Sequence, residues 1–156
     1  MHALKDAPGI VVLPPVLVGG ALLTGIALHY TVWTVELMPV IIARPLGFML
    51  FVAAGLLAHS AQLAMNRVGT NILPTQPTLA IVTDGPYRFT RNPLYIAALG
   101  VYLGVTLWVD GLVPLVLVLP VAWMLHWGIV LREERYLHAK FGATYEAYRS
   151  QVRRWL

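Results

Sequence analysis

The sequence predicts an all-α membrane protein: a bundle of four transmembrane helices with amphipathic cytoplasmic helices at the C-terminal end. Composition is the first observation, since 58% of the 156 residues are hydrophobic, 12% are charged and the mean hydropathy is +0.71. Soluble domains are nearer half apolar and a quarter charged, so these charges cannot cover a water-soluble globule. Four apolar segments and an uneven distribution of basic residues are the second and third observations.

Each apolar segment is interpreted as one span, and the segments cover approximately residues 10–30, 46–65, 94–109 and 112–131. A spanning helix needs roughly 20 apolar residues, so the third is short and is expected to begin inside protein at Pro93. Asp110-Gly111 predicts a tight turn that pairs the last two segments as an antiparallel hairpin. The first is interpreted as a retained span, because it is long for a signal peptide and no clear cleavage site follows it.

The basic residues predict the orientation of a single domain covering residues 1–156. Every Lys and Arg except Arg44 lies before the first span, between the second and third, or after the fourth. Basic residues mark the cytoplasmic face, so we expect both termini there, together with the loop 66–93 and the helices of residues 132–156. In a bacterium this would be the inner membrane.

Small residues at four-residue spacing predict how the spans pack. Gly100 and Gly104 form a GxxxG pair in the third span, and Ala54 and Ala58 have the same spacing in the second. Such residues allow close approach of helix backbones in lipid. Packing within one bundle is favoured over a dedicated dimer interface, so the chain is expected to be a monomer or a homodimer.

The C-terminal part after the fourth span is charged and helical in character. Residues 132–141 favour a helix, and Gly142 is a natural helix stop. Residues 143–156 predict a second short helix with Tyr145 and Tyr148 on one face. An amphipathic helix lying on the membrane surface is the alternative interpretation.

Two cytoplasmic elements carry candidate chemistry. The loop ends in TDGPYRFTRNPLY, where arginines suit carboxylates or phosphates and tyrosines offer flat apolar faces with polar tips. Anchoring of Arg88 and Arg91 to lipid headgroups is an equally good interpretation. Glu133 and Glu134 follow the fourth span directly, and they are expected to meet either neighbouring arginines or a cationic ligand.

Several functional classes find no support. The chain has no cysteine, which excludes disulfides and thiolate ligands, and its histidines are not paired at three- or four-residue spacing, so no metal site is expected. The formal charge of +4 lies beside apolar spans, where it indicates anionic lipid rather than nucleic acid.

The stretch GPYRFTRNPLYIAALGVYLG, followed after a helical hairpin by REERYLHAKFGATYEAYRSQVRRWL, resembles the isoprenylcysteine carboxyl methyltransferase and phospholipid methyltransferase group of integral membrane enzymes. The resemblance covers roughly residues 66–156. It implies a helical bundle that binds S-adenosylmethionine on its cytoplasmic side under the loop and the C-terminal helices. The methyl acceptor, a lipid-like or small apolar molecule, would arrive from the bilayer.

The family motifs match this chain residue by residue. As implied by the resemblance, the cofactor-binding residues are Gly85, Pro86, Tyr87, Arg88, Asn92, Pro93, Tyr95, Glu133 and Glu134. The catalytic residues are Arg91, Asn92 and Glu134, and the substrate-binding residues are Tyr145, Tyr148 and Arg149. One departure is Asn92, where the family has histidine, because asparagine can form hydrogen bonds but cannot act as a base near neutral pH.

These residue types suit methyl transfer, which is a direct displacement without a protein nucleophile. We expect Glu133 or Glu134 to face the cationic part of the cofactor, and Arg88 or Arg91 with loop amides to hold its carboxylate. Most of the rate would come from alignment of acceptor, methyl group and sulfur and from exclusion of water.

Three other functions compete with this prediction. A proton-coupled transporter needs an ionisable group in mid-membrane, and no Asp, Glu, Lys or Arg interrupts the four segments, so His126 would serve alone. A non-catalytic helical partner protein would pack through Gly100 and Gly104 and leaves the loop and the glutamates unexplained. A membrane reductase would need a nicotinamide site, and no glycine-rich dinucleotide fingerprint is present.

Overall fold

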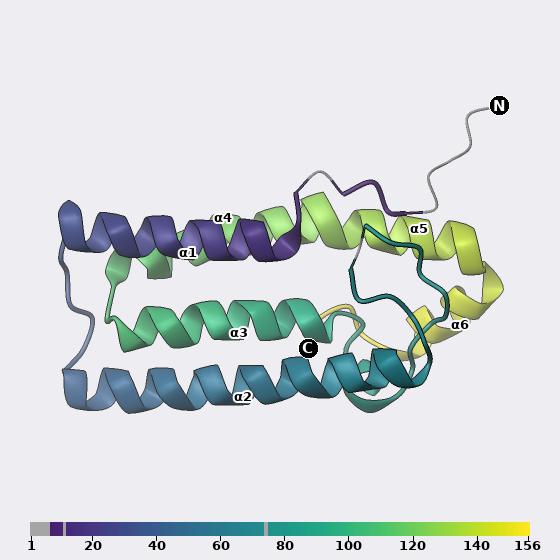
Figure 1. Cartoon of the computed structure of the whole chain (residues 1–156), viewed down its shortest axis with the longest axis horizontal. Helices are drawn as coiled ribbons and strands as arrows, with labels where there is room; N and C mark the ends of the chain where they lie inside the picture. Colours follow the sequence, from purple (N-terminus) through teal and green to yellow (C-terminus); the bar gives the residue numbers. More distant parts are fainter. Residues whose placement is uncertain (1–6, 11, 74) are drawn as a thin grey trace.

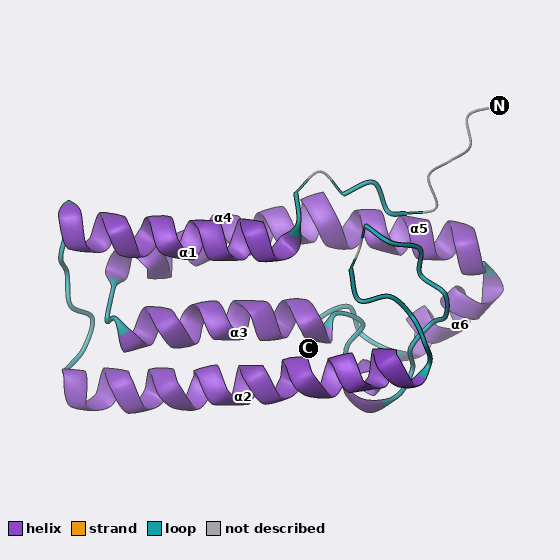
Figure 2. Ribbon diagram, in the orientation of Figure 1, coloured by secondary structure: helices purple, strands orange, loops and turns teal. Residues whose placement is uncertain are grey.

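The computed structural model describes residues 7–10, 12–73 and 75–156. Within this described part, all extended runs of regular structure are helices (Figure 2). They are α1 (Pro14–Thr31), α2 (Val40–Arg67), the 3₁₀ turn η1 (Gly85–Arg88), α3 (Pro93–Trp108), α4 (Leu112–Met124), the π-helix η2 (Leu125–Val130), α5 (Leu131–Phe141) and α6 (Ala143–Gln151). The predicted all-helical fold is confirmed.

The apolar helices α1, α2, α3 and α4 run side by side along the long axis of the molecule (Figure 1). Helix α2 packs mainly against α3, and α1 packs against α4 and α3. The short connections between α1 and α2 and between α3 and α4 lie at one end of this bundle. The long loop after α2, together with α5 and α6, lies at the other end, so the polar elements are gathered there.

The predicted hairpin between the last two apolar segments is present. Asp110 has a positive φ of 52°, a conformation that short polar side chains tolerate better than others. A Cβ atom on Gly111 would lie 2.8 Å from Cγ of Pro114, so only glycine fits there without rearrangement. Helix α3 begins at Pro93, as expected, because the first turn of a helix does not need that N–H group.

The GxxxG pair packs inside the molecule, against α2. A Cβ atom on Gly104 would lie 2.7 Å from the backbone nitrogen of Phe51, and one on Gly100 would lie 2.8 Å from Cβ of Ala54. On the facing helix, a Cβ atom on Gly47 would lie 2.6 Å from the carbonyl oxygen of Gly104. The two backbones are therefore nearly in contact, which confirms intramolecular packing through these small residues.

Two of the described helices are long and apolar enough to cross a membrane: α2 with 28 residues, and the continuous helix Leu112–Phe141 with 30. Helix α3 is apolar but shorter, with 16 residues. Large apolar side chains point outward from α2, where Ile41 is 79% exposed and Leu56 is 66% exposed. This outward apolar surface suits lipid, and four complete membrane crossings stay a prediction.

The C-terminal region differs from the expected pair of helices at its end. Gly142 stops α5 with φ 51°, as predicted, but α6 ends at Gln151 and Val152 is extended. The tail then returns to the segment before α3, where Thr90 and Arg153 form an isolated parallel β-bridge and the Arg91 N–H donates to the Arg153 carbonyl at 2.9 Å. These backbone pairs replace the helical hydrogen bonds expected for residues 152–156.

Candidate functional site

A cavity of about 540 Å³ lies where α1, α3, the long loop, α5 and α6 meet. One part of its wall is polar, formed by Tyr87, Arg91, Asn92, Tyr95, Glu133, Glu134, Tyr145 and Tyr148. The other part is apolar and reaches between the helices of the bundle, with side chains that include Val18, Leu22, Ala98 and Val101. One space therefore joins a charged region to an apolar one.

Glu133 is the carboxylate of this cavity that is held by a tyrosine. The Tyr95 hydroxyl donates to its Oε1 at 2.6 Å. Glu133 lies beyond the apolar stretch, which ends at Leu131. Burial raises the pKa of its carboxyl group to about 7. The hydrogen bond from Tyr95 lowers this pKa, and the negative charge of Glu134 raises it. A carboxylate with little water around it gains from a cationic ligand.

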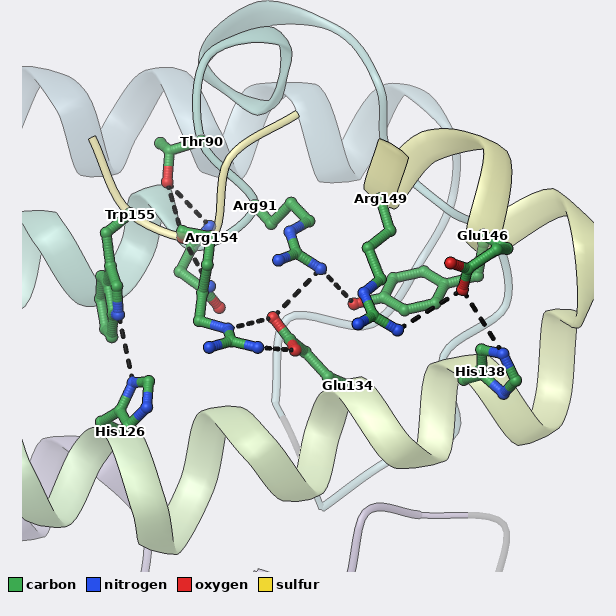
Figure 3. Close-up of polar contacts among 11 residues, drawn as sticks. Thr90, Arg91, His126, Glu134, His138, Glu146, Arg149, Arg154 and Trp155 are labelled. Atoms are coloured by element: carbon green, nitrogen blue, oxygen red, sulfur yellow. Dashed lines mark hydrogen bonds and ion pairs between the residues drawn. The ribbon is translucent and has the colours of Figure 1, made fainter. Parts of the chain in front are cut away.

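Glu134 is instead enclosed by arginines. Its carboxylate accepts hydrogen bonds from Nε and Nη2 of Arg154 at 2.8 and 2.9 Å, and Nη1 of Arg91 lies 3.2 Å away. Figure 3 shows the Glu134 side chain between the two guanidinium groups. The fork geometry towards Arg154 is a strong, geometrically specific pairing, so the negative charge of Glu134 is largely neutralised by the protein.

Arg91 contacts the cavity with part of its hydrogen-bonding capacity unused. Its side chain is 8% exposed, and its Nη1 donates to the Tyr145 hydroxyl at 3.4 Å. Its buried Nε has no hydrogen-bond partner among the described residues. A buried donor without a partner costs free energy, and an anionic ligand group in the cavity would lie beside this guanidinium.

Asn92 holds the C-terminal tail. Its Nδ2 donates to the carbonyl oxygen of Arg154 at 2.9 Å, and the Thr90 hydroxyl donates to the same oxygen at 3.1 Å. Farther along the tail, the Trp155 indole donates to Nδ1 of His126 at 3.2 Å (Figure 3). The tail is thus held beside the start of α3 at two points of Arg154: Asn92 binds its carbonyl oxygen and Glu134 binds its guanidinium.

Tyr87 and Tyr148 connect the long loop to α6. The Tyr148 hydroxyl donates to the Tyr87 carbonyl at 2.8 Å. Burial raises the pKa of both phenols, so their hydroxyls are neutral donors at physiological pH. The short η1 turn that contains Tyr87 begins at Gly85, which has a positive φ of 59°, and this turn directs Tyr87 towards the cavity.

The cavity collects most, but not all, of the residues suggested by sequence. Arg88 and Arg149 are exposed and, like Gly85 and Pro86, are not among the described residues of its wall. Arg149 lies 3.5 Å from Glu146 in a surface pair. Two features were missed: Arg154, because a continuous helix was expected there, and the apolar wall from α1, whose sequence carries only hydropathy.

The chain matches the family model described as phospholipid methyltransferase over residues 42–144. It is 35% identical over 72 residues to the protein-S-isoprenylcysteine O-methyltransferase of Schizosaccharomyces pombe, a match covering 46% of this chain and 30% of that protein. It is also 35% identical over 63 residues to an uncharacterized protein of Haemophilus influenzae, covering 40% of this chain and 100% of that protein. No solved structure matches the chain.

Proposed function

This chain belongs to the phospholipid methyltransferase family, and from that premise we propose that it transfers a methyl group from S-adenosylmethionine to a lipid-like or small apolar acceptor at the cytoplasmic face of a membrane. The activity is a proposal because the match covers only 30% of the length of the yeast methyltransferase. The observation that carries it is the single cavity that joins a charged wall to an apolar one.

The polar part of the cavity has a group for each part of the cofactor. Arg91, whose side chain lines the cavity, would hold the carboxylate. Glu133 would face the cationic part, since Glu134 is already paired with Arg91 and Arg154. The aromatic rings of Tyr87 and Tyr148 offer flat surfaces for the adenine.

The apolar part would take the acceptor. Its walls include apolar side chains of α1, α2 and α3, so an apolar tail could lie between these helices while its reactive group reaches the polar region. S-adenosylmethionine, when bound, supplies the methyl group on its sulfonium. The protein's part is then to align the two molecules, to exclude water and to surround the sulfonium with preorganised groups. Asn92, bonded to the Arg154 carbonyl, positions the tail.

Isothermal titration calorimetry with S-adenosylmethionine and S-adenosylhomocysteine tests the cofactor assignment. Glu133→Gln is expected to weaken the binding of S-adenosylmethionine at least about tenfold, because a hydrogen bond or contact to a charged group contributes roughly 1.5–3 kcal/mol. A larger loss for S-adenosylmethionine than for S-adenosylhomocysteine would place Glu133 near the sulfonium. Arg91→Ala is expected to weaken the binding of both molecules, because both carry the carboxylate.

Arg88→Ala and Arg149→Ala are matched controls, since both arginines are exposed and lie outside the described cavity wall. They should leave both affinities unchanged. Wild-type affinity in Glu133→Gln and Arg91→Ala, or a loss confined to the control variants, would refute the assignment of this cavity to the cofactor.

A further inference from the structure

A second cavity, of about 310 Å³, lies at the opposite end of the bundle from the candidate cofactor site. It is formed where α1 ends, α2 begins and α3 turns into α4, the end at which the short connections lie in Figure 1. Its wall includes His29, Tyr30, Glu36, Arg44, Trp108 and Asp110. The methyl-transfer proposal makes no use of any of these residues.

The charges of this cavity are mixed and sum to a negative value, with Glu36 and Asp110 against Arg44. Asp110 is 8% exposed, and its Oδ1 accepts hydrogen bonds from the backbone N–H groups of Leu37 and Met38 at 3.1 and 3.2 Å. These bonds fix the carboxylate at the cavity without neutralising it. Glu36 and Arg44 also line the cavity, and both are exposed. A ligand carrying both a cation and an anion would complement this arrangement.

The cavity wall includes a buried polar group that has no hydrogen-bond partner among the described residues. His29 is 2% exposed, and its Nδ1 has no hydrogen-bond partner among the described residues. Its ring contacts the ring of Tyr30 edge to face, with centroids 4.9 Å apart. Buried polar groups in proteins are almost always hydrogen-bonded, and His29 is among the residues that line the cavity, so a polar occupant would have an unpaired imidazole beside it.

Exposed apolar side chains lie on the cavity wall and next to it in sequence. Val40 and Trp108 line the cavity and are 54% and 48% exposed, and Ile41, which follows Val40 on α2, is 79% exposed. Tryptophan is enriched where a membrane meets water, and the end of a spanning bundle lies at that depth. The occupant is therefore expected to have a charged head beside long apolar chains.

We propose that this second cavity binds the headgroup of a zwitterionic phospholipid with a primary ammonium group. Arg44 takes the phosphate, Glu36 and Asp110 face the ammonium, and the acyl chains lie along the exposed side of α2 beside Ile41. An anionic phospholipid without an ammonium group would be disfavoured, because it would leave two carboxylates facing a further negative charge. The site is separate from the methyl-transfer site.

Native mass spectrometry of the full chain, released from micelles containing equal amounts of phosphatidylethanolamine and phosphatidylglycerol, tests this proposal. Saturating S-adenosylhomocysteine is present throughout. The wild type is expected to retain phosphatidylethanolamine about fivefold better than phosphatidylglycerol, a preference of roughly 1 kcal/mol. Glu36→Gln and Arg44→Gln should each reduce that preference to near one, while Glu146→Gln, an exposed glutamate at the other end of the bundle, should preserve it.

Equal retention of the two lipids by the wild type, or an unchanged preference in Glu36→Gln, would overturn the proposal. Soluble O-phosphoethanolamine distinguishes a lipid from a free headgroup: it should compete weakly, and competition as effective as that of the lipid would contradict the role of the acyl chains. Failure of the methyl-transfer proposal is recognised separately, because it would appear as unaltered cofactor affinity in the Arg91 and Glu133 variants.

Discussion

The adjacent glutamates Glu133 and Glu134 show how far single residues can differ within one motif. Successive residues on a helix point about 100° apart, and here that rotation separates two environments. Glu134 is bound by Arg91 and Arg154, whereas Glu133 accepts a hydrogen bond from Tyr95 and borders the cavity. The pair therefore divides into a residue that fastens the tail and a residue available to a ligand.

Cofactor affinity is expected to depend on pH through Glu133. Its pKa is raised to about 7 by burial, and a cation binds its ionised form, so the affinity for S-adenosylmethionine should be full above pH 7 and fall as the pH drops through that value. Tyr95→Phe removes a hydrogen bond that lowers this pKa, so the midpoint should move to higher pH. Titration calorimetry between about pH 6 and pH 8.5 measures both.

The matched control for this pH dependence is Glu133→Gln, in which the side chain no longer titrates. The affinity of this variant for S-adenosylmethionine should be lower and should not change with pH over the same range. A profile that survives this substitution, or a midpoint that moves to lower pH in Tyr95→Phe, would assign the titration to another group.

At the scale of elements, helices α2 and α3 approach each other closely, and small residues make this contact possible. Gly47 of α2 faces the backbone of α3, and a Cβ atom there would lie 2.6 Å from both the Gly104 oxygen and the Trp108 nitrogen. A Cβ atom on Gly55 of the same helix would meet no other group within 4 Å. Glycine is therefore required at position 47, where α2 faces α3, and is not required at position 55.

Gly47→Ala is expected to lower the stability of the bundle by about 1–3 kcal/mol, the usual cost of overpacking a close contact. Gly55→Ala should be neutral or slightly stabilising, since alanine favours the helix more than glycine does. Thermal unfolding in the same detergent compares the two variants. Equal melting temperatures for both would contradict the close approach of α2 and α3.

The elements that sequence could predict are those set by local chemistry. Apolar runs located the helices to within a few residues in most cases, Asp110-Gly111 marked a turn and Gly142 marked a helix stop. The extended tail after Gln151 could not be predicted, because its backbone pairs with Thr90 and Arg91, far away in sequence. The π-helix Leu125–Val130 likewise has no local signal.

The same distinction applies to the site. The motif residues Tyr87, Arg91, Tyr95 and Glu133 were identified from sequence and lie on one cavity. The role of Arg154 and the apolar wall from α1 depend on tertiary packing. The spacing of residues in the sequence does not predict such contacts between distant segments. Arg88 and Arg149 share a motif with cavity residues but have exposed side chains.

On the scale of the whole molecule, the two ends of the bundle differ in chemistry. The loop after α2, α5 and α6 gather at one end, and the short connections lie at the other (Figure 1). Among the described basic residues, Arg44 is beside the second cavity at the short-connection end. If the apolar helices span a membrane, this asymmetry orients the loop and the C-terminal helices towards the cytoplasm.

Single introduced cysteines test that orientation, and they are simple to interpret because the natural chain has none. Thr83→Cys in the long loop and Ser150→Cys in α6 should react with a membrane-impermeant maleimide only after the cells are opened. Val32→Cys, in the exposed connection after α1, should react in intact cells. Labelling of all three from the same side would contradict the proposed arrangement of the spans.

The central claim is that this bundle methylates a membrane-soluble acceptor within the cavity that joins Glu133 and Arg91 to the apolar space between α1 and α3. Its most direct test incubates the purified protein with membrane lipid extract and methyl-labelled S-adenosylmethionine, followed by mass spectrometry of the organic phase. A labelled lipid or small apolar product is expected with the wild type and the Arg149→Ala control, and at least about tenfold less with Glu133→Gln. No labelled apolar product from a wild-type protein that binds the cofactor, or equal labelling by Glu133→Gln, would contradict it.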